Sequence, residues 1–132
     1  MKKITLDTNS YSKFFEGDNK ILDELNKSIL IFIPSIVLGE LFHGFYRGNY
    51  LIKNEDRLNK FLNKPTVKIT NVTLKTAKIY GEIKNKIWKK GYPIPTNDIW
   101  IAASAIETDS TLVTYDKHFL NIPGLKLWKE IK

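Results

Sequence analysis

Hydrophobic positions along the chain follow two rhythms, one typical of strands and one of helices. Residues 29–33 are apolar at every position, as in a strand of a parallel sheet that is covered on both faces. Residues 74–88 repeat their apolar positions every three or four residues, which predicts a long helix. The apolar stripe of that helix is expected to be Leu74, Ala77, Tyr80, Ile83, Ile87 and Trp88.

Extended to the whole chain, the pattern predicts an alternation of strands and helices. Strands are expected at 3–6, 29–33, 66–69, 111–114 and 125–128. Helices are expected to end near residues 15, 27, 46, 62, 90 and 108, with a short turn or helix at 116–120. Three residues, Asp18, Thr73 and Thr96, are expected to cap the helices that follow them.

This order of elements predicts an α/β fold. Repeated strand–helix–strand units imply a central, mainly parallel sheet of four to five strands between helices, a three-layer α/β/α sandwich. No long linker or repeat interrupts the pattern, so residues 1–132 are expected to form one domain. In such folds the ligand lies beyond the carboxyl ends of the strands.

Composition excludes several classes of protein. With 42% hydrophobic and 27% charged residues, the chain is expected to be a soluble globular domain rather than a disordered one. The absence of cysteine excludes a disulfide scaffold, a thiolate metal site and a cysteine nucleophile. No apolar run approaches the roughly 18 residues of a membrane span, and no export signal is evident, so we expect a cytoplasmic protein without a membrane partner.

The net charge of +7 points to a polyanionic partner, although it does not prove one. Nearly all 21 basic residues are lysines, since Arg47 and Arg57 are the only arginines. Lysine enrichment also follows genome composition and growth temperature, so the charge by itself leaves both explanations open.

Two aspartates come directly after predicted strands. Asp7 follows the first strand, and Asp116 follows the strand at 111–114 by two residues. Each could simply cap the helix or turn that comes next. Their shared position at the carboxyl edge of the sheet makes them candidates for a site as well.

Two further acids interrupt apolar helix faces. Glu40 shares its face with Ile36 and Val37, and Asp98 shares its face with Ile101. A long-range ion pair could explain Glu40, and a favourable position near the helix N-terminus could explain Asp98. The alternative is a bound cation, because an unpaired buried carboxylate costs several kcal/mol.

Together the four acids predict a metal site. Four carboxylates in one crevice repel one another unless protons or cations neutralise them. Oxygen ligands without cysteine favour a hard ion, Mg²⁺ or Mn²⁺. Without these four, 10 acids remain against 21 bases, so the rest of the surface carries +11. An acidic pit within a basic surface suits cleavage of a phosphodiester backbone.

The same residues resemble the motifs of the PIN-domain nucleases, most of all the VapC-type toxins of toxin–antitoxin pairs. The resemblance spans the full chain. It rests on four ordered segments: Leu6-Asp-Thr-Asn9, Val37-Leu-Gly-Glu-Leu41 with Gly44, Asn97-Asp-Ile-Trp-Ile-Ala-Ala-Ser-Ala105 and Thr114-Tyr-Asp-Lys-His-Phe119.

The resemblance implies a metal-dependent endoribonuclease with a cognate antitoxin and a homodimeric state. Its catalytic and metal-binding residues would be Asp7, Glu40, Asp98 and Asp116, which hold one or two Mg²⁺ or Mn²⁺ ions. Its supporting residues would be Asn9, Thr114 and Thr8. Cleavage would leave a 5′-phosphate and a 3′-hydroxyl, and the family's habit rather than the chemistry selects RNA.

Some alternatives remain open at this stage. Glu40 and His43 have the spacing of a di-iron pair, but a second such pair is absent. His118 is expected to be a surface residue, although it lies close to Asp116 in sequence. Three aromatic residues are candidates for antitoxin contact: Phe14, Phe15 and Tyr46. The alternative functions are an RNA-processing nuclease without an antitoxin and a non-catalytic nucleic-acid-binding module.

Overall fold

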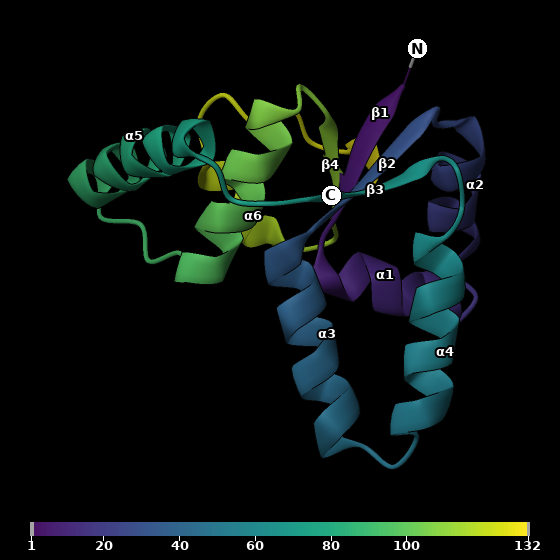
Figure 1. Ribbon diagram of the computed structural model, residues 1–132. Coiled ribbons are helices and arrows are strands. Elements are labelled where there is room, and N and C mark those ends of the chain that lie inside the picture. The colour runs from purple at the N-terminus through teal and green to yellow at the C-terminus, as the bar shows by residue number, and fades with distance from the viewer. Residues whose placement is uncertain (1, 132) are drawn as a thin grey trace.

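A four-stranded parallel sheet forms the centre of the computed structural model, which describes residues 2–131 (Figure 1). Its strands are β1 (Lys3–Leu6), β2 (Leu30–Pro34), β3 (Val67–Thr70) and β4 (Thr111–Val113). The helices are α1 (Thr8–Phe15), α2 (Asn19–Lys27), α3 (Ser35–Arg47), α4 (Leu51–Leu62), α5 (Leu74–Lys90) and α6 (Thr96–Glu107). Two short 3₁₀ helices follow, η1 (Lys117–Asn121) and η2 (Lys129–Ile131). The α/β class and the parallel central sheet are confirmed. None of these helices is both long and apolar enough to cross a membrane.

The order of the strands determines where loops and helices meet. All neighbours pair in parallel in the order β3-β2-β1-β4. The chain therefore moves outward from β1 through β2 to β3, and then returns to the other side of β1 to add β4. In Figure 1, α1, α2 and α4 lie on one side of the sheet and α5 and α6 on the other. The carboxyl ends of β1 and β4 thus form a switch point, where loops leave for opposite faces.

The core forms between the sheet and the helices on its two faces. Ile4 and Leu6 of β1 and Leu112 and Val113 of β4 are fully buried. In helix α6, Ile99 and residues 101–105 are buried, and its three alanines have no exposed surface. These small side chains allow close packing of the helix against its neighbours.

The predicted fifth strand at 125–128 is reduced to a single bridge. Leu127 pairs with Leu112 in parallel, and Leu112 donates its N–H to the carbonyl of Lys126 at 2.8 Å. Trp128 is buried beside β4, and the chain then turns into η2. The apolar pattern of residues 125–128 therefore results from packing against β4, and this segment does not form a regular strand of the sheet.

Two details of the predicted helices differ from the structure. In α5, Leu74 and Trp88 are 76% and 77% exposed, and the inward positions include Thr76, Ile83 and Ile87. The cause lies in the capping box of Thr73 and Thr76, since both hydroxyls also donate to Glu107 of α6 and turn this face of α5 inward. The predicted cap of α6 is also wrong, since Thr96 is already helical.

At the start of α6, Pro95 holds the cap position without a side-chain hydrogen bond. Its extended backbone, with φ of −55° and ψ of 141°, enters the helix directly. Proline has no N–H, so it adds no unpaired donor at this helix start, and its carbonyl accepts the N–H groups of Asp98 at 3.1 Å and Ile99 at 3.3 Å.

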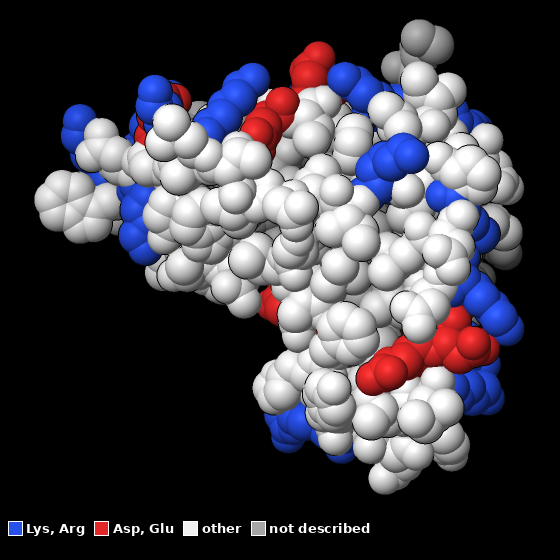
Figure 2. Space-filling view, in the orientation of Figure 1, with Lys and Arg blue, Asp and Glu red and all other residues white. Residues whose placement is uncertain are grey.

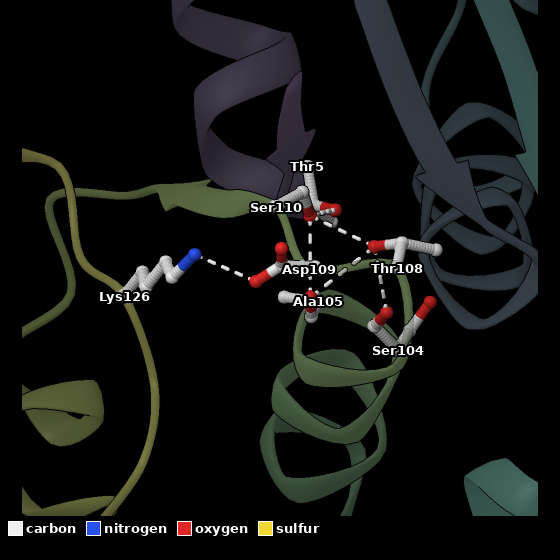
Figure 3. A network of polar contacts seen from close by, with 7 residues as sticks. All are labelled: Thr5, Ser104, Ala105, Thr108, Asp109, Ser110 and Lys126. Carbon is white, nitrogen blue, oxygen red and sulfur yellow. Dashed lines mark hydrogen bonds and ion pairs between the residues drawn. The ribbon is translucent and has the colours of Figure 1, made fainter. Parts of the chain in front are cut away.

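A buried polar network joins α6 to β1 and β4 (Figure 3). Ser110 Oγ shares hydrogen bonds with Thr5 Oγ1 at 2.6 Å and with Thr108 Oγ1 at 2.9 Å. Thr108 also donates to the carbonyl of Ser104 at 3.0 Å. Because Thr5 is fully buried in β1, the network links the end of α6 to the centre of the sheet.

We expect Ser110→Ala to destabilise the fold by about 1–2 kcal/mol, because it leaves the buried Thr5 hydroxyl without this partner. The double variant Thr5→Val/Ser110→Ala should regain most of that loss, since neither polar group then remains. Urea denaturation of the two single variants and the double variant measures the coupling. An additive double variant would show that the hydrogen bond does not stabilise the sheet.

Candidate active site

An acidic cleft of about 120 Å³ lies at the switch point of the sheet. Its walls come from the β1–α1 junction, α3, α6 and the segment after β4. The residues that line it are Asp7, Thr8, Asn9, Glu40, Asp98, Ile101 and Asp116. In Figure 2, acidic atoms are visible at the re-entrant corner between the lobe formed by α5 and α6 and the arm formed by α3 and α4. The structure thus brings together the four acids, although they lie up to 109 residues apart in the sequence.

Asp7 is the innermost carboxylate of the cleft. Its side chain is held in place at both oxygens: Oδ1 accepts the N–H of Ser10 at 2.9 Å, and Oδ2 accepts the hydroxyl of Thr114 at 2.5 Å. Asp7 is therefore the N-cap of α1 and is also 4% exposed within the cleft. The cap expected from the sequence is confirmed, and the same side chain lines the cleft.

Two threonines orient the surrounding acids. Thr114 is fully buried, and besides donating to Asp7 it accepts the N–H of Asp116 at 2.9 Å. Thr8 donates to Glu40 Oε1 at 2.5 Å. Glu40 is half-buried rather than buried, which corrects the expectation of a carboxylate on a wholly apolar face. Its other oxygen lies 3.4 Å from the amide nitrogen of Asn97.

His118 lies over the outer pair of acids. Its Nδ1 atom lies 3.2 Å from Asp116 Oδ1 and 3.6 Å from Asp98 Oδ2. Asp116 also accepts the N–H of His118 at 2.9 Å, and so caps η1. The side chain of His118 is 52% exposed, so the expectation of a surface histidine is confirmed, but the residue is also in contact with the site.

The electrostatics of the cleft show crowded negative charge. Burial raises the pKa of Asp98 to about 6, and the carboxylates of Asp116 and Glu40 add to the rise. Burial also raises the pKa of Asp7, against the lowering effect of its hydrogen bonds with Thr114 and Ser10. Within residues 2–131, no lysine or arginine forms an ion pair with any of the four acids.

The donor set fits a divalent cation. Four carboxylates offer oxygen ligands, and hard ions such as Mg²⁺ and Mn²⁺ prefer these. Burial is the main cause of the raised pKa values of Asp7 and Asp98, and a cation in the cleft would favour the charged forms of both carboxyls. The long-range lysine pairing that would have explained Glu40 is not present in the described residues.

Sequence reasoning missed Asn97 as a neighbour of the cleft, and it expected His118 at the surface without its contact with Asp98. Asn97, which directly precedes Asp98, reaches Glu40 from the first turn of α6. His118 approaches Asp98, which is 20 positions away in the sequence. Asn97 directly precedes Asp98, and His118 lies two residues after Asp116. Closeness to these acids along the sequence was the only indication that both residues could lie at the cleft. By contrast, Asn9, Thr8 and Thr114 lie at the cleft as predicted.

Comparison with known protein families agrees with this geometry. The model of the PIN domain matches residues 4–125, which include all four acids and almost the whole sheet. The chain belongs to the PIN-domain family. Within this family it belongs to the VapC ribonucleases, as its relatives show.

Among the relatives of this PIN domain, ribonuclease VapC2 from Rickettsia felis is 37% identical over 107 residues, covering 80% of this chain and 78% of the relative. Ribonuclease VapC1 from Haemophilus influenzae is 28% identical and covers 95% of both chains. Among solved structures, VapBC2 from Rickettsia felis bound to a DNA fragment from the promoter has a TM-score of 0.84 at 30% identity, covering 96% of this chain and 97% of that chain. DNA-bound VapBC from Salmonella typhimurium has a TM-score of 0.87 at 25% identity, with coverages of 97% and 98%.

We expect the metal-free protein to lose stability as the pH rises from about 4 to about 6. In this range the folded state keeps a proton on Asp98, whose pKa is about 6, while the unfolded chain has already released it at a pKa near 3.8. The folded state then binds more protons, so the free energy of unfolding falls with rising pH. Asp98→Asn should flatten this slope and raise the melting temperature at pH 7.5 by about 2–5 °C.

Thermal unfolding in EDTA between pH 4 and 8 measures both effects. Asp23→Asn, on the exposed face of α2, is the matched control and should retain the slope of the wild type. A lower melting temperature for Asp98→Asn at pH 7.5 would contradict the repulsion inferred for the cleft.

Proposed function

We propose that the acidic cleft is the active site of a metal-dependent endoribonuclease. The observation that carries the proposal is the convergence of Asp7, Glu40, Asp98 and Asp116 with no ion pair to a lysine or arginine within residues 2–131. These four residues would hold one or two ions, with Mg²⁺ or Mn²⁺ preferred by their oxygen ligands. Membership of the VapC ribonucleases supports the same reaction.

Hydrogen bonds within the chain orient two carboxylates of the site before any substrate binds. A divalent ion bound there makes a water molecule acidic enough to yield hydroxide near neutral pH and stabilises negative charge on phosphate oxygens. Thr114 and the N–H of Ser10 keep Asp7 in one orientation, and Thr8 does the same for Glu40. Because these contacts exist before substrate binds, little reorganisation is needed during the reaction. We propose Thr8, Asn9 and Thr114 as supporting residues on this basis.

The charge distribution supports binding of a nucleic-acid backbone. Outside the four acids the chain carries 21 basic and 10 acidic residues, a balance of +11. Lysines attract phosphates as point charges and make binding dependent on salt. Attack by water in line with the leaving oxygen would produce a 5′-phosphate and a 3′-hydroxyl. We propose RNA as the substrate because the relatives are named ribonucleases, and we propose the cytoplasm as the place where it acts.

A second surface suits a regulatory partner. Two neighbouring clefts of about 240 and 160 Å³ lie between α1 and α4 and share Phe15 and Arg57. Phe14 and Phe61 are packed against Phe15, so the surface combines aromatic rings with a guanidinium. Solved relatives are VapBC toxin–antitoxin complexes. We propose that an antitoxin peptide with apolar and acidic side chains docks here.

The homodimer that the resemblance implies is also part of the proposal. Helix α5 exposes Leu74 and Trp88, each more than three-quarters accessible, and the following loop exposes Tyr92. Large apolar side chains at the surface favour association. A second copy of the chain that covers this helix would bury them.

We expect Asp98→Asn and Asp116→Asn to reduce RNA cleavage by at least about a hundredfold, because each removes a negative ligand of the ion. Both variants should remain folded, since they relieve repulsion. Cleavage of a total RNA sample by purified protein, with circular dichroism as the folding check, measures this result. Asp23→Asn serves as the control and should cleave like the wild type.

EDTA should stop cleavage, because it removes the divalent ion and the carboxylates cannot activate water without one. Added Mn²⁺ should restore cleavage. Unchanged cleavage in chelator, or by the double variant Asp98→Asn/Asp116→Asn, would refute the proposed mechanism. Asp7→Asn is a less suitable variant, because the single amide oxygen of asparagine cannot replace both carboxylate oxygens, which accept from Ser10 and Thr114 in this buried position.

We expect Phe15→Ala to weaken binding of the proposed antitoxin by at least about tenfold while RNA cleavage stays unchanged. Phe15 contributes to both clefts and is 38% exposed, so its loss removes contact area without opening the core. Titration of labelled antitoxin measures the affinity, with Leu22→Ala, at an exposed position of α2 outside both clefts, as the control. Equal affinity for Phe15→Ala and the wild type would place the antitoxin elsewhere.

A further inference from the structure

His118 holds a nitrogen atom at the opening of the acidic cleft. The ring is positioned by its own backbone, because Asp116 caps η1 by accepting the N–H of His118. This turn places Nδ1 3.2 Å from Asp116 Oδ1 and 3.6 Å from Asp98 Oδ2. The residue thus faces two of the acids that we propose as metal ligands.

The spacing of these atoms is close to the spacing of ligands around one ion. Adjacent donors in an octahedral shell with bonds of about 2.1 Å lie about 3.0 Å apart. One ligand atom from each of Asp98, Asp116 and His118 lies within 4.8 Å of the others. Within residues 2–131, no other group of three histidine or acidic side chains has ligand atoms this close to one another.

We propose that His118 is a nitrogen ligand of the ion held by Asp98 and Asp116, and that it makes the site select transition-metal ions such as Co²⁺ and Ni²⁺ over Mg²⁺. The inference rests on the proposed function of the cleft. Imidazole nitrogen binds divalent transition metals well, whereas Mg²⁺ prefers oxygen ligands and keeps its water. A site with acids alone would discriminate less between these ions.

The competing role for His118 is that of a hydrogen-bond donor that only orients the two carboxylates. Asparagine separates these roles, since its side-chain amide can donate to the carboxylates but lacks a basic nitrogen. Because the His118 side chain is half exposed, its replacement removes little packing. His43 is exposed on α3 and is the other histidine of the chain, so His43→Ala is the matched control.

The experiment uses the full chain without a polyhistidine tag, because a tag would itself bind transition metals. Isothermal titration with Co²⁺ and with Mg²⁺ gives the ratio of the two dissociation constants for the wild type, His118→Ala, His118→Asn and His43→Ala. We expect both His118 variants to weaken Co²⁺ binding by at least about tenfold. Their Mg²⁺ affinity should change by less than about threefold, and His43→Ala should match the wild type.

The absorption spectrum of bound Co²⁺ provides a readout that does not depend on affinity. Loss of a nitrogen ligand should change the visible bands in both His118 variants, and His43→Ala should retain them. If His118→Asn keeps the wild-type ratio and spectrum, His118 only positions the carboxylates and the proposal is overturned. If the wild type cleaves RNA and binds ions but His118→Ala leaves the ratio unchanged, this inference fails and the proposed function stands. If the wild type binds neither ion, both fail.

Discussion

Mutual repulsion of carboxylates is the constraint around which this cleft is organised. Asp7, Glu40, Asp98 and Asp116 point into one cleft without a lysine or arginine to offset them in the described residues. The raised pKa values of Asp7 and Asp98 show that the folded protein carries a cost in return for this arrangement. A buried core and hydrogen-bonded threonines on the same elements offset that cost, so a site that is unfavourable on its own persists.

Strand order explains why the acids meet. In the order β3-β2-β1-β4, β2 and β3 are added on one side of β1 and β4 is added on the other. In such a sheet the loops after β1 and β4 leave in different directions, and a cleft opens between them. Asp7 follows β1 directly and Asp116 follows β4 closely, while α3 and α6 bring Glu40 and Asp98 to the same edge. The network of Thr5, Thr108 and Ser110 ties α6 to the central strand and so supports this placement from the far end of the helix.

Several residues serve the local fold and the site at once. Asp7 caps α1 and Asp116 caps η1, yet both line the cleft. A cap requires an oxygen that accepts one backbone N–H, which leaves the rest of the carboxylate available to a ligand. These cap hydrogen bonds hold the two side chains in one orientation. Residues that lie outside the strands and helices can therefore still present their carboxylates at fixed positions in the cleft.

Thr8, Asn9 and Thr114 followed from the resemblance to the PIN-domain nucleases. The order of most strands and helices and the choice of the four acids followed from the local pattern of the sequence. These features depend on periodicity, caps and position after a strand, which are properties of short segments. Tertiary structure decided the rest: the reduction of residues 125–128 to one bridge, the inward turn of Thr76 on α5, the half-burial of Glu40 and the approach of His118 to Asp98. Each of these depends on contacts between distant segments, because the rotation of a helix and the reach of a side chain are determined by what packs against them.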